Sequence, residues 1–168
     1  WNLAMGSQEL YDWLDAEPQL FHPGDLDYIH SVERISKLSN VISINGGVQL
    51  DLMGQENAES VGTRQLSGIG GQMDFLEGAF RSKGGKGFIC INSSRVTKDG
   101  QRKSNILATI PGGSTISAPR TMIQYVATEY GIASLSGKTL RERAEAMASI
   151  AHPDFREELL KYARENFK

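Results

Sequence analysis

Apolar residues follow two patterns along the chain. In some stretches they recur every three or four positions, which is typical of amphipathic helices, and elsewhere they form short runs bounded by glycine, proline or polar residues, which is typical of strands. Helical spacing predicts helices over residues 7–17, 25–38, 73–82, 139–150 and 154–167. Apolar runs predict strands over 41–45, 48–52, 88–91, 106–108, 115–117 and 125–128, with short extended pieces within 57–65.

Strands interleaved with helices predict an α/β fold, in which a single open sheet carries helices on both faces. The 168 residues suit one domain with a sizeable core, and no repeat, low-complexity tract or linker divides the chain. The strands 41–45 and 48–52 form either a hairpin or one kinked strand across Gly46-Gly47. Residues 93–104 are polar and basic, so we expect an irregular segment there with a turn at Lys98-Asp99-Gly100.

The stretch Gly68-Ile69-Gly70-Gly71-Gln72 passes from a glycine turn directly into a predicted helix. Three glycines in four positions let a ligand approach the backbone closely. The unpaired N–H groups and the positive dipole end of a helix favour an anion or a developing oxyanion. The alternative is a tight turn that packs a helix against a sheet, because glycine-rich turns are weakly specific.

Composition narrows the classes of function. A net charge of −2 argues against a nucleic-acid surface as the main function, and no apolar run approaches the length of a membrane span. The single cysteine, Cys90, rules out a disulfide within the chain and fits a reducing compartment, so we expect a cytoplasmic protein. Its place in an apolar strand predicts an inert core thiol. The histidines lack metal-ligand spacing, and we expect no metal site.

Several catalytic motifs are missing or incomplete. No serine lies in a G-x-S-x-G elbow, and Gly68-x-Gly70 lacks the third glycine of a dinucleotide fingerprint. Gly137-Lys138-Thr139 ends like a phosphate loop, but Ile132 stands where the first glycine is required. We interpret Gly137-Lys138-Thr139 as a helix start.

Two further features are candidates for ligand binding. Glu129 ends a short predicted strand just before a glycine, and ligands of open α/β sheets gather at such strand ends. A surface or helix-capping acid is the alternative. The polar segment carries cations that suit phosphate groups or else form a solvated loop, namely Arg95, Lys98, Arg102 and Lys103.

Four ordered blocks of sequence carry a family resemblance. They are residues 48–60 (VQLDLMGQENAES), 67–75 (SGIGGQMDF), 127–138, which begins ATEYGIA, and 141–156. Together they resemble the acetyl-CoA hydrolase/transferase family, in the branch of 4-hydroxybutyrate and butyryl-CoA:acetate CoA-transferases. The resemblance extends over about residues 6–160 and implies that residues 1–168 are the C-terminal domain, with a NagB/RpiA-type fold.

The resemblance implies a ping-pong transfer of CoA between a short acyl-CoA and a carboxylic acid such as acetate. A glutamate attacks the thioester, and a mixed anhydride and then a glutamyl-CoA thioester form. That glutamate belongs to the N-terminal domain, upstream of this chain, whose first residue is Trp1. The chain is therefore expected to be a fragment, inactive alone, with its own N-terminal domain as partner, CoA as substrate, no tightly bound cofactor, and a dimeric assembly.

The resemblance also assigns roles to individual residues. Gly71 matches a glycine whose backbone N–H faces the thioester oxygen, with Gly70 and Gln72 beside it. Val48 matches a position that lines the pantetheine arm, and Glu129 matches a glutamate beside the catalytic centre.

Lys98 matches a lysine near the CoA, although the loop length differs and Arg95 is a rival. Many relatives carry an asparagine near an Asn-Asp-Pro run where this chain has His30-Ser31-Val32, and some use it at the oxyanion site. Either His30 or Ser31 replaces it, or the backbone serves alone.

Two alternatives to a transferase remain at the level of sequence. In a CoA hydrolase, water takes the place of the acceptor acid. A non-catalytic module that binds CoA or a nucleotide is the alternative of another class.

Overall fold

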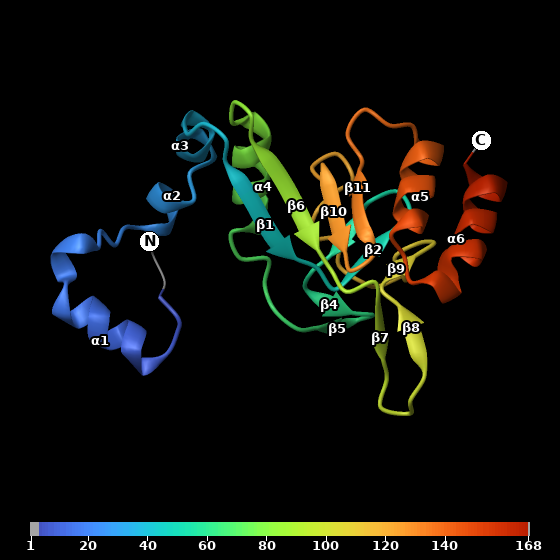
Figure 1. The fold of residues 1–168 in the computed structure, drawn as a ribbon, viewed down its shortest axis with the longest axis horizontal. Coiled ribbons are helices and arrows are strands. Elements are labelled where there is room, and N and C mark those ends of the chain that lie inside the picture. The colour runs from blue at the N-terminus through green and yellow to red at the C-terminus, as the bar shows by residue number, and fades with distance from the viewer. Residues whose placement is uncertain (1–3, 168) are drawn as a thin grey trace.

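A computed structural model describes residues 4–167, and its largest sheet has four strands (Figure 1). Their order is β1-β6-β10-β11, where the strands are β1 (Ile42–Gly46), β6 (Lys86–Cys90), β10 (Tyr125–Thr128) and β11 (Gly131–Ser134). The first three are parallel, and β11 returns antiparallel to β10. The α/β class is confirmed, and the parallel strands end together at one edge of the sheet.

The remaining strands form three small sheets, so the prediction of a single sheet was wrong. They are β2 (Gln49–Asp51) between β3 (Glu56–Asn57) and β9 (Ile106–Leu107), then β4 (Ser60–Val61) with β5 (Arg64–Gln65), and β7 (Ser94–Val96) with β8 (Arg102–Ser104). The predicted hairpin of 41–45 with 48–52 does not form, because β1 and β2 belong to different sheets on either side of Gly47.

Two other predicted segments differ from the structure. Residues 93–104, expected to be irregular, are the β7–β8 hairpin, whose strands pair on either side of the predicted turn. Gly100 adopts φ 81° at that turn, which favours glycine. Residues 115–117 form no strand, and the nearest ladder contact is an isolated bridge between Glu56 and Ala118.

Helix α4 (Gln72–Arg81) covers one face of the four-stranded sheet, and α3 (Val32–Lys37) packs on α4. Leu76 of α4 is buried together with Ile89 of β6. Gly78 allows the two helices to approach, because a Cβ there would lie 2.5 Å from a methyl group of Ile35. The opposite sheet face is not covered within residues 4–167, since Ile44 is 68% exposed, and the prediction of helices on both faces was wrong.

The C-terminal helices α5 (Leu140–Ser149) and α6 (Pro153–Asn166) confirm their predicted positions. Thr139 and Glu142 form a reciprocal capping box at the start of α5, and Pro153 occupies the first turn of α6. Arg143 reaches back from α5 and donates hydrogen bonds to three backbone carbonyls, those of Met53, Leu135 and Arg120. The buried Arg143 guanidinium thus joins α5 to the turns that contain Met53 and Arg120 and to the end of β11.

The N-terminal part holds α1 (Gln8–Ala16), a 3-10 turn (Pro18–Leu20), α2 (Leu26–Ile29) and α3. A single helix over 25–38 was predicted, but the chain breaks where Ser31 caps α3 by accepting a hydrogen bond from the Arg34 N–H. Helix α1 lies apart from the sheets (Figure 1).

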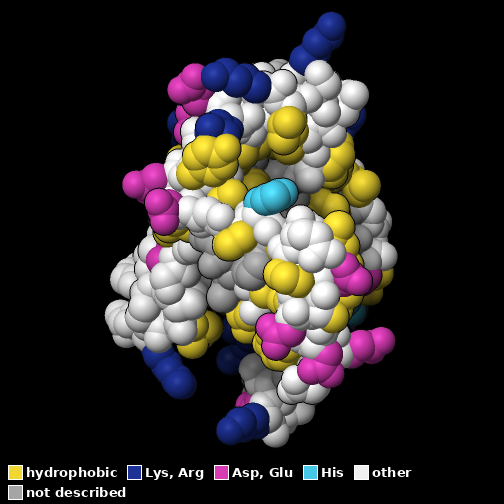
Figure 2. Space-filling view, turned by 90° about the vertical axis from the view of Figure 1, so that its left-hand side faces the viewer, with side chains coloured by type: hydrophobic (Ala, Val, Ile, Leu, Met, Phe, Trp, Pro, Cys, Tyr) yellow, Lys and Arg dark blue, Asp and Glu magenta, His cyan; other side chains and the backbone are white. Residues whose placement is uncertain are grey.

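Figure 2 views the molecule from the side of α1. Hydrophobic side chains run across the middle of this face, and Lys and Arg side chains lie at its upper and lower ends. Trp13 and Leu20 are among the large apolar side chains exposed in this part of the chain. Over the described range, 4–167, no helix is both long and apolar enough to cross a membrane.

Candidate functional site

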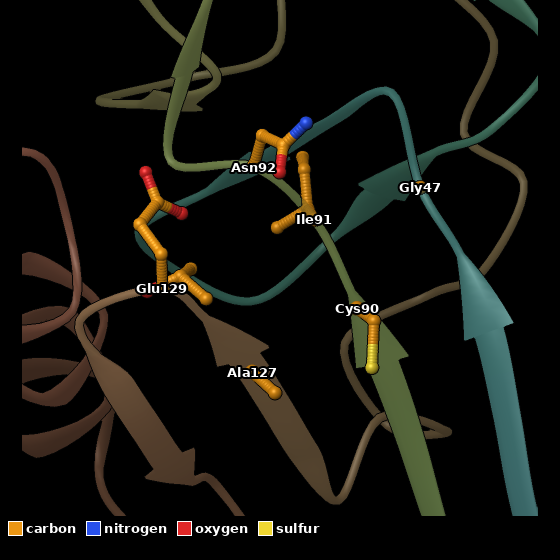
Figure 3. Close-up of a pocket in the computed structure, with 7 residues that line it drawn as sticks. Gly47, Cys90, Ile91, Asn92, Ala127 and Glu129 are labelled. Carbon is orange, nitrogen blue, oxygen red and sulfur yellow. The ribbon is translucent and has the colours of Figure 1, made fainter.

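A cavity of about 440 Å³ opens where β1, β6 and β10 end (Figure 3). Carboxyl ends of parallel strands meet at one edge, where open α/β sheets bind their ligands. The volume lies in the range of small-molecule sites. Backbone and side chains from three strand ends line it, namely Gly47, Cys90, Ile91, Asn92, Ala127, Thr128 and Glu129.

Glu129 lies at the strand-end cavity, as its position after β10 predicted. Its two carboxylate oxygens accept hydrogen bonds from the backbone N–H and the hydroxyl of Ser93, at 2.9 and 2.6 Å. Desolvation acts to raise the pKa of Glu129, but the two Ser93 hydrogen bonds, with smaller contributions from its own backbone and from His152, lower it below the ordinary value. Glu129 is thus held as an oriented anion at the mouth of the cavity.

Cys90 is exposed and lines this cavity, so the prediction of an inert core thiol was wrong. Side chains alternate along β6, and Ile89 takes the buried face while Cys90 takes the open one. An apolar run looks the same in sequence whether one face of the strand or both are covered.

The glycine loop leads into α4 as predicted. Gly70 adopts φ 60° and Gly71 is the residue before the first turn of the helix. The ring of His30 lies directly against Gly71, since a Cβ there would be 2.3 Å from two ring atoms. His30 also contacts Phe75 edge-on, with ring centroids 4.9 Å apart. A glycine is therefore required at position 71 because the His30 ring lies so close to its backbone. The glycine loop is separate from the strand-end cavity, since none of its residues lines that cavity.

Glu56 is a buried acid next to the strand-end cavity residue Gly47, and the sequence did not single it out. Its side chain is fully buried, and it accepts a hydrogen bond from the side-chain amide of Gln72, the first residue of α4. Burial raises the pKa of Glu56 to about 8, although the Gln72 hydrogen bond acts to lower it. A lone glutamate in a polar stretch carries no signal of burial, because the burial depends on contacts with Gly47 and Ala118 from distant segments.

The other residues expected to bind CoA are spread over two places. Val48 follows Gly47 and is half-buried, with its N–H bonded to the Asn57 carbonyl. Lys98 is exposed at the tip of the β7–β8 hairpin, which projects away from the sheets (Figure 1). Its rival Arg95 donates a hydrogen bond to the Asn105 side chain.

His30 and Ser31, the two candidates for the oxyanion side chain, have different surroundings. Ser31 is occupied as the cap of α3, whereas His30 lies against the glycine loop. Nδ1 of His30 is 3.9 Å from Asp74 Oδ2, too far for a hydrogen bond, and it has no hydrogen-bond partner among residues 4–167. No set of three or more His, Cys, Asp or Glu side chains within that range is arranged to hold a metal ion.

Comparison with known proteins shows the family of this chain. The sequence profile of the acetyl-CoA hydrolase/transferase C-terminal domain matches residues 6–163. The chain is 45% identical to the butyryl-CoA:acetate CoA-transferase of Anaerostipes caccae over 95% of its own length and 36% of that protein. It is 44% identical to the 4-hydroxybutyrate coenzyme A transferase of Clostridium kluyveri, over 97% of the chain and 37% of that protein.

The fold matches a solved structure as well. The 4-hydroxybutyrate CoA-transferase of Porphyromonas gingivalis superimposes with a TM-score of 0.78 at 39% identity, covering 98% of this chain and 36% of that one. The chain thus spans a little over a third of the length of these relatives. It belongs to the acetyl-CoA hydrolase/transferase family, as a member of its C-terminal domain.

Proposed function

We propose that this chain acts, in a full-length protein, as the C-terminal domain of a CoA-transferase that moves CoA between a short acyl-CoA and a carboxylic acid such as acetate. The observation that carries the proposal is the cavity at the ends of three parallel strands, with the oriented carboxylate of Glu129 at its mouth. Membership of the family and the transferase names of its relatives support the choice of chemistry.

The proposed reaction begins with a glutamate carboxylate outside this chain. It attacks the thioester carbonyl, the CoA thiolate leaves, and an acyl-glutamyl anhydride forms. The thiolate then attacks the glutamyl carbonyl, which releases the first carboxylate and leaves a glutamyl-CoA thioester. The acceptor carboxylate repeats the two steps in reverse, so that the glutamate is regenerated and a new acyl-CoA departs.

The glycine loop is proposed to stabilise the oxyanion that develops at the thioester oxygen. The N–H groups of the first turn of α4 have no partner within the helix, and its dipole end favours negative charge. Gly71 and Gly70 carry no side chain that would keep an acyl group away from these donors. His30 is proposed as the additional side chain at this site rather than Ser31, because Ser31 already caps α3.

The chain is proposed to contact CoA along two surfaces. Val48, beside the cavity residue Gly47, suits the apolar part of the pantetheine arm. Lys98 suits the phosphates better than Arg95 does, because Lys98 is exposed whereas Arg95 is bonded to Asn105.

The open face of the four-stranded sheet is proposed to pack against the N-terminal domain of the same protein. Ile44 and Ile132 are 68% and 63% exposed there, and Phe88 stacks on Tyr125 with ring centroids 4.9 Å apart. An apolar surface of this kind marks an interaction site. The cavity lies at the end of the same face, so the N-terminal domain would bring its glutamate to Glu129 by covering this sheet.

A pair of substitutions in the full-length protein tests this packing. Ile44→Asp should separate the domains, seen as faster proteolysis between them and loss of transfer. Ile116→Asp introduces the same charge at an apolar residue outside this face that is 41% exposed. It should change neither the rate of proteolysis between the domains nor the rate of transfer. If the two variants have equal effects, the open face of the sheet does not form the interface with the N-terminal domain.

A CoA hydrolase is the second candidate, favoured by the family description, which joins the two activities. The chemistry would be shared up to the glutamyl-CoA thioester, and water would then replace the acceptor acid. Release of free CoA that is unaffected by added acetate would identify a hydrolase. Acyl exchange that requires the acceptor acid would identify a transferase.

The decisive experiment compares the full-length protein with residues 1–168 alone. Radiolabelled acetate should enter acetyl-CoA in the presence of butyryl-CoA only with the full-length protein, because the proposed nucleophile lies outside this chain. Acyl exchange by the fragment would contradict that assignment and make Glu129, the anion at the cavity, the nucleophile to test.

A further inference from the structure

Glu56 is a buried carboxyl group for which the proposed reaction has no role. It lies on β3, pairs with Leu50 of β2, and has no exposed surface. Its carboxyl oxygen Oε2 accepts the hydrogen bond of Gln72, and Oε1 has no hydrogen-bond partner among the residues that the structure describes. A buried polar atom without a partner is costly, and such atoms often mark functional strain.

The carboxyl group stands directly behind the wall of the strand-end cavity. A Cβ on Gly47 would lie 2.8 Å from Glu56 Oε1, so only a glycine backbone separates this oxygen from the cavity that Gly47 lines. On its other side, Gln72 follows Gly71 and begins α4. Glu56 therefore contacts both the cavity wall and the end of the glycine loop, which are otherwise separate in the fold.

The surroundings of Glu56 favour the protonated acid. Burial raises its pKa to about 8, so the group keeps its proton over most of the neutral range. The titratable groups on neighbouring elements are Asp51 on β2, Asp74 on α4, Arg120 after the Ala118 bridge, and His30 against Gly71. None of them hydrogen-bonds Glu56, and the side chain that does so within residues 4–167, that of Gln72, is neutral.

We propose that Glu56 is a positioning residue: as a neutral carboxylic acid beneath Gly47 it holds Gln72, and through Gln72 it fixes the position of Gly70 and Gly71. This inference rests on the proposed transferase function of that loop. Ionisation would place an unpaired negative charge behind Gly47, next to a site where the reaction itself develops an anion, and would therefore slow the reaction. Glu56 touches no substrate atom and acts only through its neighbours.

Activity of the full-length protein as a function of pH is the first test. Wild-type kcat should fall above about pH 8, following the pKa of Glu56. Glu56→Gln keeps the shape and neutrality of the acid, so kcat at pH 7 should stay within about twofold and the alkaline fall should vanish. Glu56→Ala releases Gln72, and kcat should drop roughly 10- to 100-fold with a smaller change in the KM for butyryl-CoA.

Glu59→Gln is the matched control. It removes a carboxylate three residues along the chain whose side-chain hydrogen-bond partners are Ser117 and Gln65, so that the substitution leaves the bond between Glu56 and Gln72 untouched. It should leave the alkaline fall of kcat in place. An alkaline fall that persists in Glu56→Gln, or that disappears equally in Glu59→Gln, would overturn the proposal.

Melting temperature against pH is a second test that needs no catalytic activity. A pKa raised on folding means that the stability contributed by the proton is lost as pH rises from the unfolded value toward the folded one. Between pH 5 and 8, therefore, the melting temperature of Glu56→Gln should rise steadily relative to wild type. A constant difference would mean that native Glu56 is ionised, and would overturn the proposal. Absence of CoA transfer in a wild-type protein that shows the rising difference would instead refute the proposed function and leave the neutral acid established.

Discussion

The ring of His30 lies where a side chain on Gly71 would stand, so this glycine meets two demands at once. One is packing against His30, and the other is the proposed approach of its N–H to a thioester oxygen. Gly71→Ala keeps the N–H, but its Cβ would clash with the His30 ring and displace this donor, so kcat of the full-length protein should fall by about 10²–10³, as on loss of an oxyanion donor. Steady-state kinetics and a thermal melt should be measured together.

Gly68→Ala is the control for the glycine loop. Gly68 belongs to the same loop, does not require a positive φ, and has no atom within 4 Å of an added Cβ. Gly68→Ala should leave both kcat and the melting temperature nearly unchanged. A Gly71→Ala protein with near-normal kcat and a much lower melting temperature would show that the loop only packs against His30.

Ser93 controls the charge state of Glu129. Ser93→Ala removes one of the hydrogen bonds that lower the pKa of Glu129, so that pKa should move up toward its ordinary value. Since the ionised carboxylate is lost as pH falls through the folded pKa, the acid limb of the kcat profile should move to higher pH.

Ser94→Ala removes the neighbouring hydroxyl, which accepts from Arg102 and does not contact Glu129, and should not move that limb. If the acid limb of the kcat profile is the same in wild type and Ser93→Ala, Glu129 is not the group whose protonation lowers kcat at acid pH.

At this scale the sequence predicted the residues whose signal is local. Glu129 was correctly placed at a strand end and the glycines at the start of a helix, because each pattern is confined to a few neighbouring residues of the sequence. Cys90 was misjudged and Glu56 was missed because their burial depends on other segments: Cys90 lies on a sheet face that no segment within residues 4–167 covers, and Glu56 lies beneath Gly47.

Among the elements, α5 is joined to distant segments by a buried charged side chain, that of Arg143. Arg143 donates hydrogen bonds to the carbonyls of Met53, Leu135 and Arg120. Arg143→Ala should destabilise the domain by about 3 kcal/mol, because one buried and two part-buried hydrogen bonds from a charged donor are lost. Denaturant unfolding followed by circular dichroism measures this difference.

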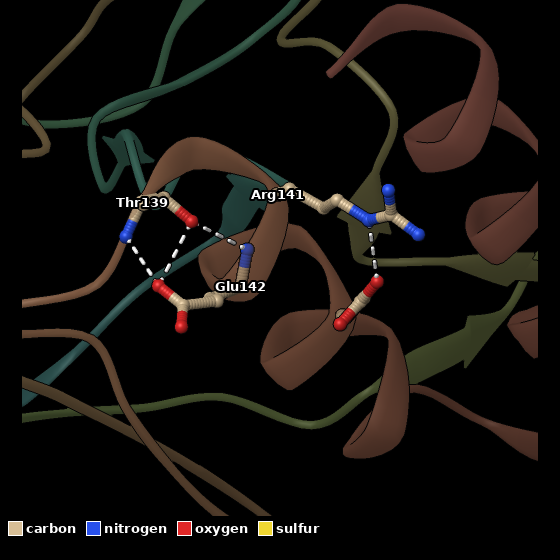
Figure 4. Close-up of polar contacts among 4 residues, drawn as sticks. Thr139, Arg141 and Glu142 are labelled. Atoms are coloured by element: carbon tan, nitrogen blue, oxygen red, sulfur yellow. Dashed lines mark hydrogen bonds and ion pairs between the residues drawn. The ribbon is translucent and has the colours of Figure 1, made fainter. Parts of the chain in front are cut away.

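Arg141 lies two residues earlier on the same helix and serves as the control. It forms an exposed pair with Glu145, beside the capping box of Thr139 and Glu142 (Figure 4). Such i, i+4 pairs contribute about 0.3–0.5 kcal/mol, so Arg141→Ala should have little effect. Comparable losses for the two variants would show that Arg143 acts through helix propensity rather than through its three carbonyls.

Helices with strong end signals were predicted closely, and pairings between distant segments were not. Thr139 and Pro153 mark the starts of α5 and α6 by interactions within one turn. Ser31 gives an equally local cap, but the apolar spacing on both sides of it favoured one long helix. The assignment of β1 and β2 to different sheets depends on partners 44 and 56 positions away along the chain, such as Lys86 for Ile42 and Ile106 for Leu50, and no local pattern specifies those.

On the scale of the whole molecule, the β7–β8 hairpin projects away from the sheets (Figure 1), and its sequence carries the cations Arg95, Lys98, Arg102 and Lys103. Lys98→Ala at its tip should raise the KM for acyl-CoA roughly two- to fivefold, the effect of one exposed ionic contact. Added salt should weaken binding by wild type more than by the variant, because salt screens that contact. Kinetics at low and high ionic strength measure both effects.

Lys161→Ala, on α6, is the control for the loss of one exposed positive charge. It should change neither the KM nor its salt dependence. If Lys98→Ala behaves in the same way, the hairpin tip is solvated surface and Arg95 becomes the next residue to examine.

The parallel order of β1, β6 and β10 has a consequence for how the chain reaches its native state. Register pairs Ile42 with Lys86 and Phe88 with Tyr125, so each contact closes a long loop before it adds stability. Topologies dominated by such distant pairings fold slowly, in contrast to the local turns of α5 and α6. During synthesis on a ribosome, the central strand β6 would lack its second neighbour, β10, until Tyr125–Thr128 emerged. In that interval β6 has an unpaired edge and the isoleucines of β1 are exposed, so the risk of aggregation would be greatest then.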